Sequence, residues 1–417
     1  MIKKNLNTKI NFLFWLMMFS FLIRFVVVYF LGDQYNEPKG YRLGVNNEWN
    51  VLLAHLIKYK SYSLLIFNEQ LIPSVFMPPM YPFFLYSINF ISNFSGDNLM
   101  YAIIFIQIIL STYCVYIFYQ INQNFFSNKL SLINSIVFSI IPLNLYYCGQ
   151  ISSINLQVLF SLLFLKFLIL IIKEKNQRNI IFFSIISGAM ILTRGEFILI
   201  FLCILFFVFL KKKIKFTNLV KIMIIISIVV SPYMVRNYIH FNEIFIVKSL
   251  GYNLWKGNNE LANVEGYTDF EKIEFKKLKN NIDNLEKNKH YEINRDNIFL
   301  EEAIGNLKNN FSKYFILFFK KFFSYYFIDI NSSYPNYYNF FHIFPIILIS
   351  ILSAPGLLFF YKNNKLENEC FGIYLFSNLI IFSIFFILPR YKLVILPIQI
   401  ILAAYFINYI MKRYVSK

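Results

Sequence analysis

The amino-acid sequence predicts an all-α polytopic membrane protein, and three observations support this fold class. Hydrophobic residues make up 58% of the 417 residues, and aromatic residues alone make up 20%. About ten apolar stretches approach the ~20 residues that a helix needs to cross a bilayer. Lysines cluster in the short loops between these stretches, as they do in the cytoplasmic loops of membrane proteins. A soluble domain of this size would not carry so much apolar surface.

Charge and cysteine usage exclude two other classes of protein. The net charge is +18 at pH 7, but the chain contains no basic domain that could bind nucleic acid, so we exclude that function. The cysteines lie scattered through apolar segments without CxxC spacing, at Cys114, Cys148, Cys203 and Cys370. We expect them to be small buried hydrophobic residues, and not a disulfide or zinc framework.

The apolar stretches predict about ten membrane spans. The first follows several lysines, as a signal peptide would, but no small-residue cleavage site comes after it, so we expect an uncleaved helix. The stretch at 197–210 is short, which favours a tilted or partly re-entrant helix. The predicted spans lie near residues 12–31, 99–118, 130–147, 154–172, 179–193, 197–210, 217–233, 342–361, 371–389 and 393–411.

Two further apolar pieces, residues 80–93 and 314–328, are shorter and interrupted. The first begins after a Pro-Pro pair, and the second contains Lys320 and Lys321. If neither piece crosses the membrane, the basic loops share one side with both termini; if both cross, two of these loops move outside. The preference for positive charge in cytoplasmic loops favours the first topology, with both pieces at the outer membrane surface as juxtamembrane helices.

We therefore expect one membrane domain over residues 1–417 with two loops on its outer face, at 32–98 and 234–313. The second loop interleaves acidic residues with lysines, which is typical of a solvated cap built from short surface helices. Arg24 lies deep in the first span, and a charge inside a membrane is expected to pair with a partner within the bundle.

Three arginines lie on the outer face, each at the end of a long apolar run. They are Arg194 in LTRGE, Arg236 in SPYMVRNY and Arg390 in PRYKLVILP. The guanidinium group is planar, always charged and matched to phosphate oxygens. The sequence therefore predicts a phosphate-binding cluster, to which Lys392 adds a fourth cation. For each residue alone, anchoring to lipid head groups is the alternative.

The segment NNEWNVLLAHLIKY at 46–59 predicts an amphipathic helix in the first outer loop. Its apolar face consists of Trp49, Leu52, Leu53, Leu56 and Ile57. Glu48 falls in the first turn, where an asparagine can cap the helix, and it is the first candidate for a catalytic carboxylate. The alternative is that Glu48 only complements the helix dipole. Asp33, just after the first span, is the second candidate; the alternative there is an ordinary boundary residue.

Several strings, in this order, resemble the GT-C superfamily of polyprenyl-phosphate-sugar glycosyltransferases. The resemblance is to bacterial relatives of the protein O-mannosyltransferases and of the lipid A aminoarabinose transferase, and it covers nearly the whole chain. It rests on NNEWNVLLAHL, FMPPMYPFFLY at 76–86, LNLYYCGQISSINL at 143–156, LTRGE, SPYMVRNY, GYNLWKGNN at 251–259 and RYKLVILP. It implies a GT-C-like bundle with an active site at the outer membrane boundary.

This chain departs from the family pattern at three places. Family members usually carry an Asp early in the first outer helix, where this chain has Asn46 and Asn47, which leaves Glu48 as the expected base. The usual Ser-Glu before a later span is Ser153-Ile154 here, so one auxiliary carboxylate is missing. Gly195 replaces the usual Pro of LTRGE, a change of little consequence.

The resemblance implies an inverting glycosyltransferase that moves a sugar from a polyprenyl phosphate to a periplasmic hydroxyl on a lipid, glycan or protein. Glu48, or else Asp33, takes the proton of the hydroxyl. Arg194, Arg236, Arg390 and Lys392 bind the phosphate leaving group. The implied location is a bacterial inner (plasma) membrane, with both termini cytoplasmic and the site periplasmic. No cofactor is required, although a divalent metal stays possible.

A polar and aromatic loop is the expected sugar-binding segment. Its residues, suited to stacking on and hydrogen-bonding a sugar, are Tyr252, Asn253, Trp255, Asn258 and Asn259, and Tyr81 is a further candidate at the donor groove. The alternative for the loop is a turn that packs on the membrane surface. Two rival functions remain, a lipid-linked sugar flippase or transporter and a glycan polymerase of another fold. A flippase would more often show paired inverted halves, which this sequence lacks.

Overall fold

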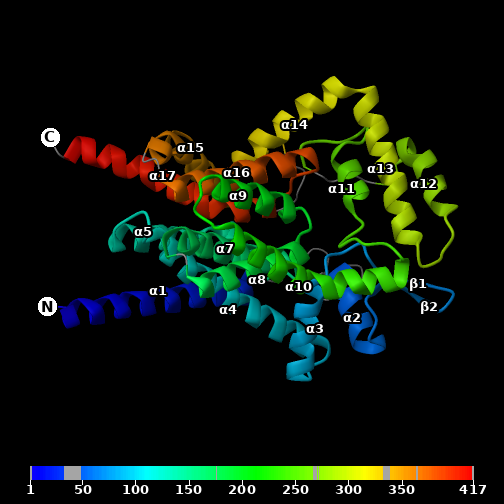
Figure 1. Ribbon diagram of the computed structural model, residues 1–417, viewed down its shortest axis with the longest axis horizontal. Coiled ribbons are helices and arrows are strands. Elements are labelled where there is room, and N and C mark those ends of the chain that lie inside the picture. Colours follow the sequence, from blue (N-terminus) through cyan, green and yellow to red (C-terminus); the bar gives the residue numbers. More distant parts are fainter. Residues whose placement is uncertain are drawn as a thin grey trace.

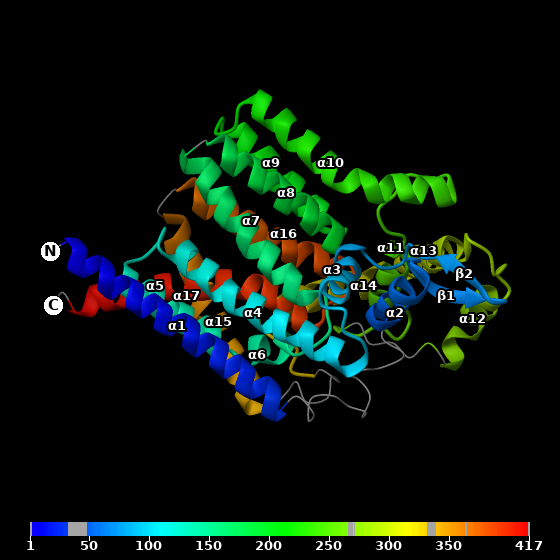
Figure 2. The same ribbon diagram turned by 90° about the horizontal axis from the view of Figure 1, so that it is seen from below.

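The computed structural model describes residues 2–31, 48–174, 176–265, 270, 272–331, 339–362 and 365–415. It is a bundle of apolar helices that carries shorter helices and a β-hairpin at one end (Figure 1). Both chain termini lie together at the opposite end in both views (Figures 1 and 2). The two ends of the chain therefore lie at the same end of the bundle, and their predicted cytoplasmic location stays a prediction.

Six helices in the described part of the chain are long and apolar enough to cross a membrane, and a bent pair makes a seventh candidate. The six are α1 (Ile2–Leu31), α4 (Gly96–Asn122), α7 (Ile154–Glu174), α10 (Phe216–Phe241), α15 (Phe340–Lys362) and α17 (Lys392–Val415), which the 3-10 turn η2 (Pro389–Tyr391) precedes. The predicted class, a polytopic helical membrane protein, is confirmed.

The bent pair consists of α5 (Asn128–Ile140) and α6 (Pro142–Cys148), which meet at an angle of 58°. The cause is local. Proline disfavours the helical conformation of the residue before it, and Ile141 is accordingly extended, at φ −60° and ψ 122°. Pro142 itself is well placed in the first turn of α6, because it has no amide hydrogen to leave unbonded there.

The remaining predicted spans are shorter or more polar helices. Helices α8 (Gln177–Thr193) and α9 (Phe197–Leu210) have 17 and 14 residues. Helix α16 (Leu366–Ile384) carries Glu367 and Glu369 in its first turn and is not among the candidate spans. The count of about ten spans therefore stays a prediction.

The end of the bundle away from the termini carries the outer elements. The prediction of an amphipathic helix is confirmed by α2 (Glu48–Tyr59), whose buried residues include Leu52, Leu53 and Leu56. The elements at this end are α2, β1 (Ser63–Phe67), β2 (Gln70–Pro73), α3 (Met80–Ser92), α11 (Leu250–Gly257), η1 (Ile273–Phe275), α12 (Lys276–Asp283), α13 (Tyr291–Asn309) and α14 (Phe311–Tyr326). Neither α3 nor α14, the two ambiguous pieces, is among the candidate spans.

The antiparallel hairpin β1–β2 is an addition to the predicted all-α fold. Its turn consists of Asn68 and Glu69, both with positive φ, at 47° and 66°. Two successive residues of this kind give the tight turn whose twist suits a hairpin. The hairpin packs against α2, since the ring nitrogen Nδ1 of His55 lies 2.7 Å from the backbone oxygen of Ser63.

Arg24 finds its partners among hydroxyl groups. Its Nε donates to Ser111 Oγ of α4 at 2.8 Å, and its Nη1 donates to Ser20 Oγ of α1 at 2.6 Å and to Ser139 Oγ of α5 at 3.2 Å. The side chain is fully buried. It therefore ties three helices together, which agrees with the expectation that a charge inside the bundle is paired.

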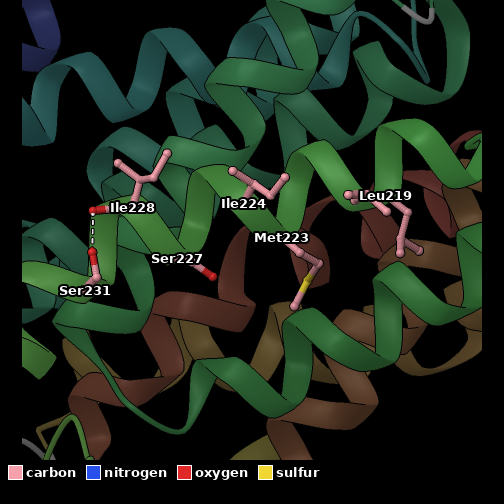
Figure 3. Close-up of a pocket in the computed structure, with 7 residues that line it drawn as sticks. Leu219, Met223, Ile224, Ser227, Ile228 and Ser231 are labelled. Carbon is pink, nitrogen blue, oxygen red and sulfur yellow. Dashed lines mark hydrogen bonds between the residues drawn. The ribbon is translucent and has the colours of Figure 1, made fainter.

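An open apolar groove runs along the outside of α10 (Figure 3). It encloses about 710 Å³ and is lined by Leu219, Val220, Met223, Ile224, Ser227, Ile228 and Ser231. The hydroxyl of Ser231 donates to the carbonyl of Ile228 in its own helix, at 3.3 Å. A surface with so few available polar groups suits lipid chains and holds no chemistry, so the functional site lies elsewhere.

Candidate functional site

Glu48 lies at the exposed N-terminus of α2, on the outer end of the bundle. The helix is held there by its apolar face, and the Trp49 ring packs edge-on against Tyr81 of α3 at 5.2 Å between centroids. This packing fixes the first turn of α2 and leaves the carboxylate of Glu48 in solvent, where a substrate can reach it.

Helix α11 stands opposite α2 and is anchored by Trp255. This side chain is 1% exposed, and its ring contacts Phe275 and Phe299 at 5.1 and 4.9 Å between centroids. The Asp296 carboxylate of α13 accepts a hydrogen bond from the backbone N–H of Tyr252 at 2.8 Å. Burial raises the pKa of Asp296, and the N–H bond from α11 opposes that shift. Helix α11 is therefore fixed on α13.

Lys256, in the last turn of α11, lies among the charges of the site. Its Nζ is 4.8 Å from the centre of the Phe386 ring and 5.9 Å from that of Tyr252. Burial lowers the pKa of Lys256, while the nearby Tyr391 and Glu48 raise it and Arg390 lowers it further. Three groups, from α2 and η2, thus lie within electrostatic reach of Lys256.

Tyr391 of η2 lies between two of the predicted arginines. The Arg194 guanidinium carbon is 4.5 Å from the centre of its buried ring, and that of Arg390 is 5.7 Å away. Arg194, which follows α8, also pairs with Glu196 at 3.2 Å. We call Arg194, Lys256 and Arg390 the cation cluster. It gathers three positive charges around one phenol ring, with one half-buried carboxylate, Glu196, to balance them.

Arg236 lies apart from the cation cluster and serves the outer scaffold. Its Nη1 donates to the backbone oxygen of Ser74 at 2.8 Å, and its Nη2 donates to that of Tyr62 at 3.1 Å. The Glu292 carboxylate of α13 accepts hydrogen bonds from the same loop, from Ser74 Oγ and from the backbone N–H of Val75. Arg236 therefore joins α10 to the hairpin beside α13.

Lys392 is also used within the protein. Its ammonium is buried and donates to the backbone oxygens of Tyr325, Tyr326 and Phe327. These carbonyls are at the C-terminal end of α14, where a helix lacks internal donors and favours a cation. Its expected role in phosphate binding stays a prediction, and the geometry adds nothing to it.

Most of the expected sugar-binding residues are likewise engaged in packing. Tyr81 is 1% exposed and donates to Gln107 Oε1 at 2.8 Å. Asn258 and Asn259 are buried and donate to backbone oxygens of α11, Leu254 and Trp255. Tyr252 and Asn253 are half-buried. These two are the members of the predicted loop that a ligand can still contact.

Two further expectations concern a second carboxylate and a metal. Asp33 lies outside the residues that the structure describes, so its place in the site is not known. Within the described ranges, no group of three or more His, Cys, Asp and Glu side chains could hold a metal ion. The possibility of a divalent metal stays a prediction.

A small cavity adjoins the cation cluster at Pro389. It encloses only about 30 Å³ and is lined by Leu143, Glu265, Ser324, Tyr325, Ile328, Asp329, Ile346, Ile387, Leu388, Pro389 and Lys392. Most of these side chains are apolar, and two are carboxylates. Burial raises the pKa of Asp329, while the backbone N–H of Asn331 acts against that shift. The cavity offers an apolar pocket directly behind Arg390.

Sequence reasoning missed three residues of this site, Lys256, Tyr391 and Glu196. Each stands inside a string that the sequence singled out, GYNLWKGNN, PRYKLVILP and LTRGE. The available signal was therefore the neighbourhood of the arginines. A lysine in a loop rich in lysines has no distinguishing pattern, so only the folded contacts identify Lys256.

Two comparisons with known proteins bear on this geometry. Residues 77–235 match a family model described as dolichyl-phosphate-mannose-protein mannosyltransferase. No curated protein sequence matches the chain. The matched segment contains α3 to α9 and most of α10, and includes Arg194.

Among the solved structures that resemble the chain are those of an oligosaccharyltransferase from Archaeoglobus fulgidus. The structure with an inhibitory peptide and a dolichol-phosphate has a TM-score of 0.58 and 16% identity, over 96% of this chain and 50% of that one. The structure tethered to an acceptor peptide has a TM-score of 0.57 and 15% identity, with 96% and 50% covered. This chain spans half the length of those proteins, and the likeness shows a shared fold.

Proposed function

We propose that the chain is an inverting glycosyltransferase of the GT-C class that uses a polyprenyl-phosphate sugar; the family model matched by residues 77–235 and the fold shared with the oligosaccharyltransferase support this. The sugar passes to a hydroxyl group on a lipid, glycan or protein. The observation that carries this proposal is the cation cluster at Tyr391, with the carboxylate of Glu48 within electrostatic reach of its Lys256.

The cation cluster suits a phosphate diester that becomes a monoester. Arg194 and Arg390 present planar donors for phosphate oxygens, and Lys256 adds a compact charge from the opposite helix. The ring of Tyr391 keeps the two guanidinium groups close together despite their like charge. A site of fixed cations stabilises charge as it develops, without reorganising at the moment of reaction.

In the proposed reaction, Glu48 is the general base and the cation cluster binds the leaving group. The acceptor oxygen attacks the anomeric carbon of the sugar, and the bond from that carbon to the phosphate oxygen breaks. The proton of the acceptor hydroxyl goes to Glu48, and the bonding electrons leave with polyprenyl phosphate, which the cation cluster binds. Attack from the side opposite the phosphate inverts the configuration of the anomeric carbon.

The half-exposed residues of α11 complete the site. Tyr252 can stack on a sugar face, and Asn253 can hydrogen-bond its hydroxyl groups. We propose that the site lies on the periplasmic side of a bacterial inner membrane; the charge bias that predicts cytoplasmic basic loops and termini supports this.

The proposal is tested with purified full-length protein in nanodiscs and a panel of labelled polyprenyl-phosphate sugars. We expect the wild type to release polyprenyl phosphate. Arg390→Ala should lower the rate of this release at least about 100-fold, because it removes one preorganised positive charge. Lys277→Ala, on the exposed surface of α12, is the control and should keep full activity. In proteoliposomes, transfer of an intact lipid-linked sugar across the bilayer without cleavage would show a flippase instead.

A further inference from the structure

Lys321 of α14 is a buried lysine that plays no part in the reaction described above. Its side chain is 0% exposed. Its Nζ donates to the backbone oxygen of Gly257 at 2.6 Å, to that of Phe385 at 2.7 Å and, at 3.4 Å, to Asn258 Oδ1. A buried amine with oxygen partners from two other segments is a junction between elements that are distant in the sequence.

The junction holds the end of α11 against the end of α16. Asn258 Nδ2 donates across the same contact to the backbone oxygen of Ile384 at 2.9 Å. Gly257 comes so close to Phe385 that a Cβ atom built on it would lie 1.6 Å from the Phe385 oxygen. The close approach of the two backbones therefore requires glycine. Lys321 packs beside this contact and donates hydrogen bonds to both backbones.

The segments joined in this way carry the cation cluster. Lys256 directly precedes Gly257, and its Nζ lies over the ring of Phe386, which directly follows Phe385. Phe386 in turn contacts Tyr391 at 6.0 Å between centroids. The position of Lys256 relative to Arg390 thus depends on the joint that Lys321 makes.

We propose that Lys321 is a positioning residue, which sets the distance of Lys256 from Arg390 by hydrogen-bonding the ends of α11 and α16. The expected effect of Lys321 on phosphate binding rests on the proposed function. Its expected effect on the contact between α11 and α16 does not. No carboxylate takes part, so the tie consists of hydrogen bonds to neutral oxygens and not of an ion pair.

The protonation of Lys321 is consistent with this role. Burial lowers its pKa to about 7, so charged and neutral forms are both populated near neutral pH. A neutral amine still has two N–H donors, enough for the oxygens of Gly257 and Phe385. The joint is therefore expected to persist in either form.

The test compares Lys321→Met with Lys320→Met in the full-length protein. Lys320 is exposed on the same helix, so its substitution is a matched control. The first readout is hydrogen exchange of the backbone amides in nanodiscs. We expect at least a tenfold faster exchange in residues 250–259 of Lys321→Met, with unchanged exchange in α4 and α7, and no change for Lys320→Met. Equal exchange in all three proteins would overturn the proposal.

The second readout is binding of geranylgeranyl phosphate, a short polyprenyl phosphate. We expect Lys321→Met to bind it about tenfold more weakly, which is about 1.4 kcal/mol. A residue that acts through Lys256 should have no further effect once Lys256 is removed, so Lys256→Met and the double variant should bind equally. Additive losses would show that Lys321 acts by another route and would overturn the positioning role.

The two readouts separate the inference from the function on which it rests. Faster exchange in residues 250–259 without any binding of geranylgeranyl phosphate by the wild type would support the joint and refute the phosphate site. A Lys321→Arg variant, which restores donors at the same place, should recover part of the binding that Lys321→Met loses. Full loss in both variants would contradict a role based on hydrogen bonds.

Discussion

Replacing Lys256 with methionine should weaken phosphate binding without weakening the protein. Methionine keeps the length of the side chain and can pack on the rings of Tyr252 and Phe386, which Lys256 already contacts. Burial and the nearby Arg390 both oppose the charge of Lys256 and lower its pKa. On balance the charge of Lys256 is therefore destabilising in the folded protein, although Tyr391 and Glu48 offset part of this, and a bound anion would offset more.

The sign of the stability effect follows from this pKa. The pKa of Lys256 is lower in the folded than in the unfolded chain, so the unfolded chain binds more protons between the two values. The unfavourable contribution of the Lys256 charge to stability is present in full below the pKa of Lys256 in the folded protein. It disappears as pH rises above the ordinary lysine pKa of 10.5. We therefore expect Lys256→Met to unfold at the same temperature as the wild type at pH 7, or at a higher one.

The effect of Lys256→Met on ligand binding is expected to be larger than its effect on stability, and it is unfavourable. A hydrogen bond to a charged group contributes about 1.5–3 kcal/mol, so removing Lys256 should weaken phosphate binding about 10- to 100-fold. A ligand at 100 times its Kd stabilises a protein by about 2.7 kcal/mol, and at a tenfold weaker Kd this falls to roughly 1.4 kcal/mol. Half or more of the stabilisation should be lost.

Thermal unfolding in nanodiscs, with and without geranylgeranyl phosphate, measures the stability of the protein and its stabilisation by the ligand in one experiment. Lys277→Met, an exposed substitution on α12, controls for the loss of a lysine elsewhere on the outer face. The reasoning is refuted if Lys256→Met unfolds several degrees lower than the wild type while the ligand still stabilises it to the full extent. That pattern would mean that Lys256 is structural.

Three further predictions concern the scaffold and the metal. Arg236→Met should lower the free energy of unfolding by about 1–3 kcal/mol, because the backbone oxygens of Ser74 and Tyr62 lose their hydrogen-bond donors. The KM of the folded enzyme for the sugar donor should stay unchanged. A raised KM at full stability would contradict this prediction. Burial raises the pKa of Glu292, so the free energy of unfolding should fall as pH rises above ~4.5. This dependence of stability on pH should be weaker in Glu292→Gln. The same dependence in both proteins would refute the prediction. Because the cation cluster already neutralises a phosphate, turnover should persist in EDTA, and a loss that Mg²⁺ restores would show a required metal.

The fold class was predictable because it follows from the period and the length of apolar stretches. The helix that begins at Glu48 was predictable for the same reason: Leu52, Leu53 and Leu56 lie on one face, and the structure buries all three. The bend at Pro142 and the hairpin turn at Asn68 were missed. They depend on one or two residues, which change no average over a window of sequence.

The candidate site was predictable only in part. Unusual charges at membrane boundaries identified Arg194 and Arg390, which the structure brings together around Tyr391. The same signal selected Arg236 and Lys392, whose donors instead meet backbone oxygens. A sequence shows that a cation is out of place, but not whether its partner is a ligand or a helix end, because both need the same donors.

The polar loop shows the same ambiguity between binding and packing. Trp255 and Asn259 have side chains suited to a sugar, and yet the structure buries both in the contacts of α11. Lys256, between them, carries no distinguishing pattern and lies in the site. The orientation of a short helix is set by the elements that pack on it, here through Asp296 and Lys321, and these lie 40 or more residues away in the chain.

The measurement that tests the central claim most directly is turnover of a labelled polyprenyl-phosphate sugar by Glu48→Gln. Glutamine keeps the size of the side chain and cannot take a proton, so we predict normal binding of geranylgeranyl phosphate and a fall in kcat of at least about 100-fold, as expected for the loss of a general base. Asp33→Asn, measured alongside, should keep its activity. Full turnover by Glu48→Gln, with loss in Asp33→Asn, would contradict the assignment and move the base to Asp33.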